Sequence, residues 1–272
     1  MSNSPSRAAY AHFSPAKEVP FEGVPKHGLR IAVIPDVQAR RGVPLGHLSA
    51  AGRYIAEKQP DVILCIGDFA DMPSLSSHEA PGSRFTEMQR YQDDVDWARE
   101  AMDLLLAPIA RVSGYNPVKI LTYGNHEDRI TRAANENPRG KQPELADLEY
   151  AKFGWRTVPF LQPVVIGGVA FCHYFPSGVM GRPFTSPAAM LRRGHMSAVA
   201  GHQQGYDIAR SKRLDGVELK AIITGSFYQH DEHYLNPYTN QHWRGMLFLN
   251  QVRNGGFDEM PLSIEFLLRK FT

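Results

Sequence analysis

The chain of 272 residues is 43% hydrophobic and 21% charged, and its formal net charge at pH 7 is only +2. This balance is typical of a globular protein and excludes a strongly basic nucleic-acid binder, although it allows a local basic patch. No stretch is long and apolar enough to span a membrane, and the polar N-terminus lacks the apolar core of a secretion signal. The sequence therefore predicts a soluble, cytoplasmic protein.

The N-terminal segment, residues 1–27, is rich in Ser, Pro, Ala and Lys and shows no periodicity. We expect it to be a tail or an arm over the surface of the protein. Residues 28–272 are enough for a sizeable hydrophobic core, and we expect them to form a single domain. Cys65 and Cys172 both lie within apolar runs, which favours buried free thiols over a disulfide.

The first half of this domain alternates apolar runs with segments of helical spacing. The predicted strands are 29–34, 61–66 and 118–122. The predicted helices are 45–58, 85–112 and 127–136. The mostly apolar strands are typical of a sheet that is covered on both faces. Strand, helix and strand at this spacing predict right-handed crossovers and parallel pairing.

The second half of the domain is a series of short apolar runs separated by turn signals such as Gly167-Gly168. The runs are 158–166, 169–174, 196–200, 219–224, 246–252 and 262–268. One helix is expected over Ser186–Arg193. We expect the apolar runs to form a second sheet with more antiparallel pairing, packed against the first sheet.

Polar side chains follow the predicted strands at the points where the strands end. They are Asp36, Gln38, Asp68, Asp71, Asn125, His126, His173, His202 and Gln204. Open α/β sheets bind ligands at the carboxyl ends of their strands. Carboxylate, amide oxygen and imidazole are ligands for divalent ions. The pattern therefore predicts a metal centre at this edge of the sheets.

Two stretches show how local geometry would serve this centre. In Leu121–Glu127 we expect Gly124 to make the turn through its freedom in φ. Glu127 would then lie in the first turn of a helix, where the helix dipole favours a carboxylate. Alternation along an extended segment would point Asp36 and Gln38 the same way, so that both can hold one ion.

Five motifs in this order, D-x-Q, G-D-F-A-D, G-N-H-E, H and G-H-Q-Q, resemble the pattern of the calcineurin-like metallophosphoesterase superfamily. The resemblance spans roughly Arg30 to Gln204. It implies an α/β fold that is a four-layer αββα sandwich, in which two mixed β-sheets are flanked by helices. It also implies a site that holds two divalent metal ions about 3.5–4 Å apart.

The resemblance implies a role for each of these residues. One ion would be held by Asp36, Gln38, Asp68 and Gln204, and the other by Asp68, Asn125, His173 and His202. A water or hydroxide that bridges the ions would be the nucleophile. His126 would stabilise the developing charge of the phosphate or protonate the leaving oxygen, and Asp71 would orient His126.

Gln38 and Gln204 depart from the family pattern, which usually has histidine at both positions, and both fall on the same ion. A neutral amide oxygen is a harder and weaker ligand than imidazole. We expect this site to be weak and to prefer Mn²⁺ or Mg²⁺ to Zn²⁺, or to fill only with substrate present. Of the possible cofactors, Mn²⁺, Mg²⁺, Fe and Zn²⁺, two Mn²⁺ ions are expected. Chains with D-x-Q and G-H-Q-Q also resemble phage- and prophage-encoded members of the superfamily.

A second polar cluster, Gly225–Tyr234, contains His230 and His233 and is followed by further aromatic and basic residues. The two histidines are candidates for substrate binding or for a missing metal ligand, and the alternative is a polar loop that bonds to itself. Aromatic residues interleaved with His and Arg would suit a nucleotide or a single strand. Arg129 is a candidate phosphate contact because guanidinium matches phosphate geometry, and the alternative is a solvated arginine.

The sequence therefore predicts a metal-dependent phosphoesterase, with a phosphodiester in nucleic acid or a nucleotide as the expected substrate. Met72 follows G-D-F-A-D where the protein-phosphatase branch carries arginine, so the substrates of that branch are not carried over. One alternative is a phosphomonoesterase that acts on a small metabolite or a phosphoprotein. Another is a non-catalytic binding protein on a degenerate site. The sequence indicates no membrane partner and does not define the oligomeric state.

Overall fold

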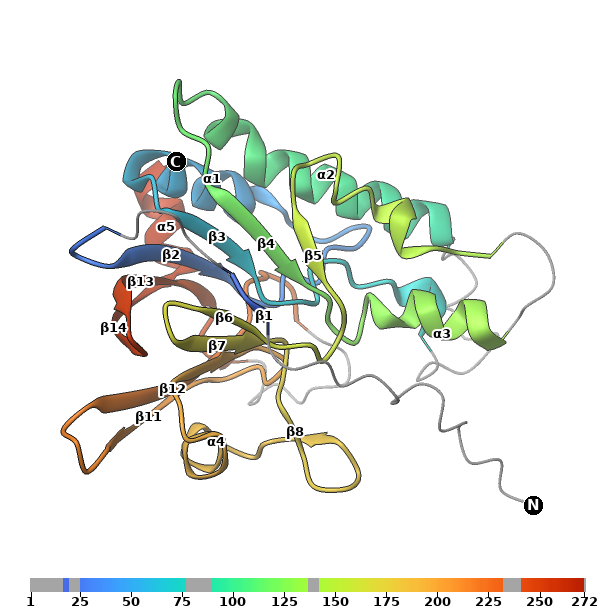
Figure 1. Ribbon diagram of the computed structural model, residues 1–272. Coiled ribbons are helices and arrows are strands. Elements are labelled where there is room, and N and C mark those ends of the chain that lie inside the picture. The colour runs from blue at the N-terminus through green and yellow to red at the C-terminus, as the bar shows by residue number, and fades with distance from the viewer. Residues whose placement is uncertain (1–16, 20–24, 77–89, 137–141, 232–240, 272) are drawn as a thin grey trace, which may run out of the picture.

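The computed structural model describes residues 17–19, 25–76, 90–136, 142–231 and 241–271. Within them, two six-stranded sheets lie face to face, and helices cover the outer side of each sheet (Figure 1). This is the expected four-layer α/β sandwich of two mixed sheets. None of the helices in these residues is long and apolar enough to cross a membrane.

The first sheet has the strand order β14-β13-β2-β3-β4-β5. Its strands are β2 (Leu29–Ile34), β3 (Val62–Cys65), β4 (Val118–Thr122), β5 (Arg156–Val158), β13 (Gly245–Arg253) and β14 (Gly256–Ser263). Strands β2 to β5 are parallel, as the strand–helix–strand spacing predicts, and β13 pairs antiparallel with both β2 and β14. The predicted strands 29–34 and 118–122 are therefore confirmed, and 61–66 is shorter by one residue at each end.

The second sheet has the order β1-β6-β7-β10-β12-β11, with three parallel and two antiparallel pairs. The first sheet has the same numbers, so the expectation of more antiparallel pairing in the second sheet was wrong. Its strands are β1 (Lys17–Glu18), β6 (Val164–Ile166), β7 (Val169–Cys172), β10 (Ala198–Ala200), β11 (Tyr206–Lys212) and β12 (Glu218–Thr224). A separate short hairpin joins β8 (Pro176–Ser177) to β9 (Arg182–Pro183). Strand β1 belongs to the expected N-terminal arm, and it extends the sheet by pairing with β6.

Three of the apolar runs in the second half of the chain do not form the second-sheet strands that were expected. The run 158–166 contains the end of one strand and the whole of another, because β5 joins the first sheet and β6 the second. The run 246–252 also returns to the first sheet, as β13. The run 262–268 is mostly helix, because the buried side chains of Ile264 and Leu267 are three residues apart, which is helical spacing.

Five α-helices lie in the described residues. They are α1 (Gly46–Lys58), α2 (Tyr91–Ala110), α3 (Asp128–Glu136), α4 (Pro187–Gly194) and α5 (Ile264–Phe271). Helices α1, α2 and α5 cover the first sheet, and α4 covers the second (Figure 1). Helix α4 begins and ends one residue later than predicted, and Ser186 caps it by accepting a hydrogen bond from the backbone N–H of Ala189. Residues 85–89 of the predicted helix 85–112 lie outside the described residues. In the described part, α2 begins only after Arg90 and ends two residues before the predicted end.

The buried side chains form one core on each side of the first sheet. Ile31 and Val33 of β2 face the second sheet, whereas Ala32 and Ile34 of the same strand face the helices. This alternation is the pleat of a strand that is buried on both faces, which is why the sequence of β2 is apolar without a break. Cys65 and Cys172 are buried free thiols, as expected.

Gly52 lets helix α1 pack closely against helix α2. A Cβ atom at this position would lie 2.2 Å from the carbonyl oxygen of Leu105 in α2. Backbone cannot yield as a flexible side chain can, so the contact requires glycine despite its poor helix propensity.

We predict that Gly52→Ala lowers the free energy of unfolding by about 1–3 kcal/mol, because overpacking outweighs the gain of about 1 kcal/mol in helix propensity. Gly46→Ala in the same helix is the control. Apart from its chain neighbours and the adjoining helix backbone, no atom of the described residues lies within 4 Å of a Cβ placed there. That variant should be neutral or slightly more stable. Urea denaturation of both variants measures the difference, and equal effects at the two positions would contradict the prediction.

His47 fixes the start of α1 to the segment that follows β12. Its Nε2 lies 2.8 Å from the carbonyl oxygen of Phe227 and therefore donates to it. The imidazole is fully buried and meets the Phe227 ring edge to face. Burial lowers the pKa of His47 to about 4. The side chain is therefore neutral in the folded protein, and its protonation would lower the free energy of unfolding.

We predict that His47 makes the metal-free protein less stable as the pH falls from 6.5 to 4. In this range the unfolded chain binds a proton at this position and the folded chain does not, so stability is lost with falling pH. At pH 5 the loss amounts to about 2 kcal/mol relative to pH 7.5. The measurement compares wild type with His47→Gln by denaturant unfolding at both pH values, which cancels the titration of all other groups. The exposed His195, changed to Gln, is the control, and a pH-independent difference for His47→Gln would show the prediction to be wrong.

Candidate metal centre

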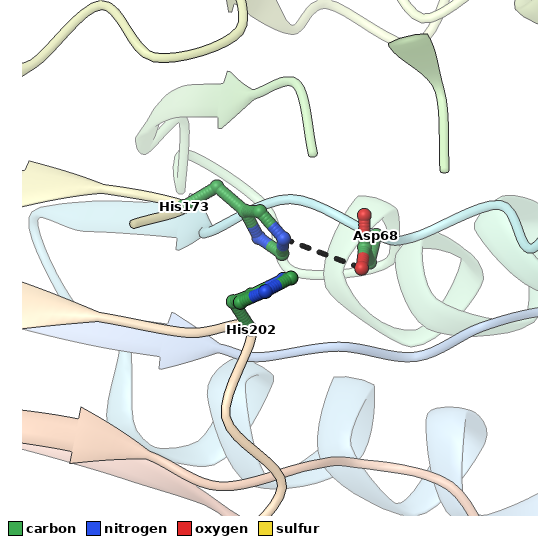
Figure 2. A group of neighbouring side chains, drawn as sticks. All are labelled: Asp68, His173 and His202. Atoms are coloured by element: carbon green, nitrogen blue, oxygen red, sulfur yellow. Dashed lines mark ion pairs between the residues drawn. The ribbon is translucent and has the colours of Figure 1, made fainter. Parts of the chain in front are cut away.

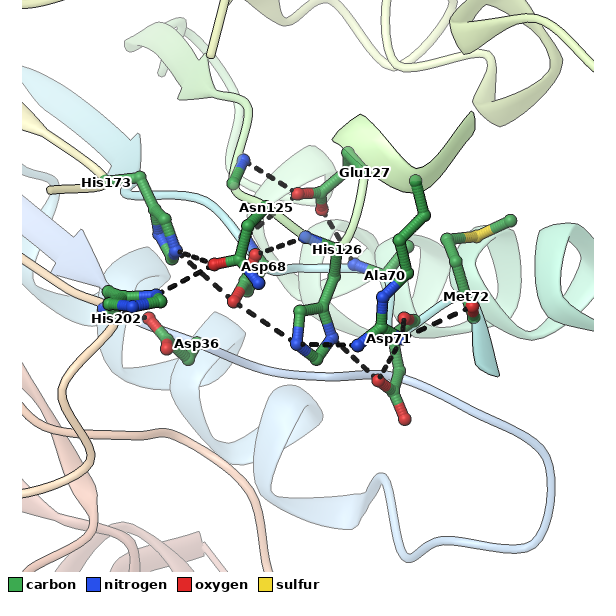
Figure 3. Close-up of polar contacts among 12 residues, drawn as sticks. Asp36, Asp68, Ala70, Asp71, Met72, Asn125, His126, Glu127, His173 and His202 are labelled. Atoms are coloured by element: carbon green, nitrogen blue, oxygen red, sulfur yellow. Dashed lines mark hydrogen bonds and ion pairs between the residues drawn. The ribbon is translucent and has the colours of Figure 1, made fainter. Parts of the chain in front are cut away.

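Side chains from both sheets meet where the strands β3, β4, β7 and β10 end. Asp68, His173 and His202 offer ligand atoms that all lie within 4.8 Å of one another (Figure 2). The Nε2 atom of His173 is 3.3 Å from Oδ2 of Asp68. The side-chain oxygen of Asn125 lies 2.9 Å from that Nε2 and 2.8 Å from Nδ1 of His202 (Figure 3). The structure thus brings four of the predicted ligands together.

The orientation of His173 favours a role as a ligand. Its Nδ1 lies 3.0 Å from the carbonyl oxygen of Ile66, and a carbonyl accepts only, so Nδ1 carries a proton. Metal-binding histidines commonly donate their second ring N–H to a backbone carbonyl in this way, which fixes the tautomer and leaves the other nitrogen for the ion. Here that nitrogen is Nε2, which faces Asp68 and Asn125.

Asp36 and Gln38 place two further oxygens in buried positions. Asp36 accepts a hydrogen bond from the backbone N–H of His202 through Oδ1, at 3.2 Å. Oδ2 of Asp36 and Oε1 of Gln38 are buried and have no hydrogen-bond partner among the described residues. A buried oxygen without a partner is costly, and a cation is one partner that would satisfy it. Asp36 and Gln38 were expected to lie on one extended segment. This expectation was wrong, because Gln38 has φ of 48° and lies in the left-handed region.

Gln204 makes a different contact from the one its motif implies. Its Oε1 accepts a hydrogen bond from the hydroxyl of Tyr228, at 2.6 Å. To act as a ligand, this oxygen would have to exchange the tyrosine for the ion. Of the two glutamines that stand in place of the family's histidines, Gln38 therefore has the freer oxygen.

Position 124 requires glycine because the site has no room for a Cβ atom there. A Cβ atom here would lie 2.0 Å from Oδ1 of Asp68. The expectation that Gly124 supplies a positive φ was wrong, because it is not among the residues with that conformation. Gly67, with φ of +99°, has both constraints, since its Cβ would also meet Nδ1 of His173 at 2.6 Å. The loop after β3, which contains Gly67, and the loop after β4, which contains Gly124, can approach this closely only because both positions are glycine.

Glu127 precedes α3 and joins the two loops that carry Asp68 and Asn125. Its carboxylate accepts hydrogen bonds from the backbone N–H groups of Asp68, Ala70 and Gly124, at 3.0, 2.9 and 2.8 Å. The expected interaction with the helix dipole is thus replaced by direct bonds, because the helix starts one residue later, at Asp128. Burial, followed by the charge of Asp68, raises the pKa of Glu127.

His126 and Asp71 form a buried pair beside the cluster. Nδ1 of His126 lies 2.7 Å from Oδ1 of Asp71 and donates to it, and its Nε2 is 3.7 Å from Oδ2 of Asp68 (Figure 3). The backbone N–H of His126 also bonds to Asp68, at 2.9 Å. Burial lowers the pKa of His126, but the charges of Asp68 and Asp71 outweigh it and raise the pKa. Nε2 therefore takes up a proton readily.

Two arginines hold Asp71 in place. Arg40 donates to Oδ2 of Asp71 at 2.7 Å, and Arg129 donates to its backbone oxygen at 2.8 Å. Nη2 of Arg129 also lies 3.2 Å from Nε2 of His126. Burial raises the pKa of Asp71, but the bond to His126 and the charges of His126 and both arginines hold it well below its usual range. Arg129 thus fixes the pair in this structure, a role that the sequence did not suggest.

The charges of the cluster shift the pKa values of its members in opposite directions. Burial raises the pKa of Asp36 to about 7, which His173 opposes and Asp68 reinforces. Burial lowers the pKa of His173, but the charge of Asp68 and the bond to it prevail, and the pKa rises to about 9. Burial and the charge of His173 lower the pKa of His202 to about 4. At neutral pH, His173 is therefore protonated and His202 is neutral.

The second polar cluster adjoins the site through two contacts. The backbone N–H of Phe227 donates to the carbonyl oxygen of Asp36 at 2.8 Å, and the hydroxyl of Tyr228 donates to Gln204. The ring of His230 stacks on that of Tyr228 at 4.4 Å, and Arg244 lies over the same ring. Tyr228 is only 1% exposed, so it offers no open face for stacking. His233 lies outside the described residues.

The residues present fit a divalent ion. Carboxylate, amide and imidazole atoms converge, and two buried oxygens have no hydrogen-bond partner among the described residues. The family model of calcineurin-like phosphoesterases matches residues 29–225, which is well over half of the chain. Among curated proteins, none matches the chain.

Proposed function

The chain belongs to the calcineurin-like phosphoesterase family, and from this premise we propose that it is a metal-dependent phosphodiesterase that acts on a nucleotide or nucleic-acid ester. The observation that supports the chemistry is the placement of the His126–Asp71 pair directly beside the ligand cluster. Asp68 belongs to both, since it faces His173 through Oδ2 and binds the backbone of His126 through Oδ1.

We assign one ion to the side chains of Asp68, Asn125, His173 and His202. The second ion is assigned to Asp36, Gln38 and Asp68, with Gln204 as a further ligand. Two bound divalent ions would supply a nucleophile by lowering the pKa of water and would neutralise charge on the phosphate. The second set is rich in oxygen, which suits Mn²⁺ or Mg²⁺ better than Zn²⁺. Mn²⁺ is the ion we propose for both.

His126 is the proposed proton donor or hydrogen-bond donor to the substrate. Asp71 accepts from Nδ1 and thereby directs Nε2 toward the side of the site where Asp68 lies. A carboxylate that fixes the tautomer of an imidazole also raises its basicity. Arg40 and Arg129 keep Asp71 ionised and fixed, so that the imidazole keeps this orientation.

The arginines also favour a diester over a monoester. Arg40 and Arg129 both pair with Asp71, so this carboxylate offsets part of their charge, and Arg129 also lies 3.2 Å from Nε2 of His126. Met72, which follows the G-D-F-A-D motif, is fully buried and apolar. A phosphodiester carries one negative charge less than a monoester dianion, and it therefore needs fewer cations around the phosphate.

We predict that metal-loaded protein hydrolyses bis(p-nitrophenyl) phosphate faster than p-nitrophenyl phosphate, and that chelator abolishes the activity. His126→Ala should lower kcat by roughly 10²- to 10⁴-fold, the usual contribution of a positioned acid or base. Its metal content, measured by elemental analysis, should equal that of wild type. His195→Ala, at an exposed position, is the control. Faster monoester turnover would assign the protein to the phosphomonoesterases, and full activity of His126→Ala would remove His126 from the chemistry.

A second prediction concerns Gln38. Titration of wild type with Mn²⁺ should show one tight and one weak equivalent, because the second ion has amide oxygens where imidazoles would bind better. Gln38→His should tighten the weak equivalent by roughly 10-fold or more. Gln203→His is the matched control, since the amide of Gln203 donates to the backbone of Phe184. Two equally tight equivalents in wild type would contradict the proposal of a weak site.

A further inference from the structure

Two aromatic side chains lie against the imidazoles of the ligand cluster. The ring of Tyr174, just after β7, is centred 4.7 Å from that of His202 and 5.9 Å from that of His173. The ring of Phe160, between β5 and β6, meets Tyr174 edge to face at 5.6 Å and lies 6.3 Å from His173. We call Phe160 and Tyr174 the aromatic wall.

The wall lies where the cluster meets solvent. His173 is fully buried, whereas His202, Asn125 and both residues of the wall are half-buried. The His126–Asp71 pair lies on the other side of Asp68 from the two imidazoles (Figure 3). The candidate site is therefore polar on one side and aromatic on the other.

Holding an ion does not require these rings. His202 is already oriented by two polar contacts, from its Nδ1 to Asn125 and from its backbone N–H to Asp36. An aromatic ring that keeps part of its surface in water at the rim of a site can gain by covering that surface with another flat group. Stacking of a nucleobase on an aromatic side chain is worth about 1–3 kcal/mol and tolerates any base.

The second polar cluster, which the sequence suggested for this purpose, does not provide such a surface in its described part. Tyr228 is buried beneath His230 and Arg244 and bonds to Gln204. The ring of Tyr174, in contrast, is half-buried and lies against the imidazoles of His202 and His173. A nucleobase is separated from its phosphate only by a sugar, so a phosphate at the cluster would bring its base close to the wall.

We propose that the aromatic wall of Phe160 and Tyr174 is a stacking subsite for a nucleobase, or an equivalent flat aromatic group, on the substrate. This inference rests on the proposed phosphodiesterase function and specifies its substrate class as nucleotide-type diesters. The wall binds the group next to the phosphate and takes no part in proton transfer. Its loss should therefore weaken substrate binding while leaving the chemical step intact.

The test uses two diesters with the same leaving group, thymidine 5′-(p-nitrophenyl) phosphate and methyl p-nitrophenyl phosphate. Wild type should prefer the nucleoside ester by roughly 10-fold or more in kcat/KM, chiefly through KM. Tyr174→Leu should lose this preference and keep its turnover of the methyl ester, whereas Tyr174→Phe should retain the preference. Tyr115→Leu, at a half-buried tyrosine at the opposite end of the first sheet, is the control.

A binding measurement separates this inference from the proposed function. Calorimetry of the Mn²⁺-loaded protein compares thymidine 5′-monophosphate with methyl phosphate, and the nucleotide should bind more tightly in wild type but not in Tyr174→Leu. Protein that cleaves neither diester would contradict the proposed function, and this binding preference would still test the wall. Equal handling of both ligands by wild type would overturn the inference. So would an equal loss for both ligands in Tyr174→Leu, because the ring would then serve only to support His202.

Discussion

The candidate site depends above all on the buried carboxylate of Glu127. It binds three backbone N–H groups from two loops that follow neighbouring parallel strands, β3 and β4. Those loops carry Asp68 and Asn125, so one side chain sets the position of two proposed ligands relative to each other. Its three acceptor bonds satisfy donors that would otherwise be buried without partners, a cost of about 1–3 kcal/mol each. The link also places the backbone N–H of His126 against Asp68, which ties the proposed acid to the ligand cluster.

The backbone around this link is held in conformations that few residues adopt. Gln38, Asp68 and His202 all have φ between 48° and 66°, although none is glycine. Such conformations cost of order 1–3 kcal/mol each and persist only where the surroundings determine them. Here the surroundings are hydrogen bonds between loops, such as that from the backbone N–H of Gln38 to the carbonyl oxygen of Asp68. Three of the strained positions are thus residues assigned to the ions, although other described non-glycine residues, such as Gln59 and His195 at helix ends, share the conformation.

The sequence could predict those features of the fold and the site that depend on residues close together in the chain. Strands such as 29–34 were recognisable because both faces are buried, which makes the run apolar without a break. The proposed ligands were recognisable because each follows a strand. The return of β13 to the first sheet, the bond between Tyr228 and Gln204 and the role of Arg129 depend on residues far apart in the chain. The aromatic wall belongs to this second class, since neither Phe160 nor Tyr174 is part of a motif.

The electrostatics of the cluster show why it is suited to exchange protons for metal ions. Asp36 and Asp68 are both fully buried, and two such carboxylates repel each other unless positive charge stands between them. In the protein alone, that charge is a proton on His173, whose pKa is raised to about 9 chiefly by Asp68, against the opposing effect of burial. Burial raises the pKa of Asp36 to about 7, so the single proton on His173 offsets the charge of the two carboxylates only in part. A divalent ion bound to Nε2 of His173 would replace this proton and bring a second positive charge. The same residues that are costly as a buried acidic cluster would thus be favourable as a ligand set. Metal binding at this cluster would therefore also stabilise this edge of the sheets.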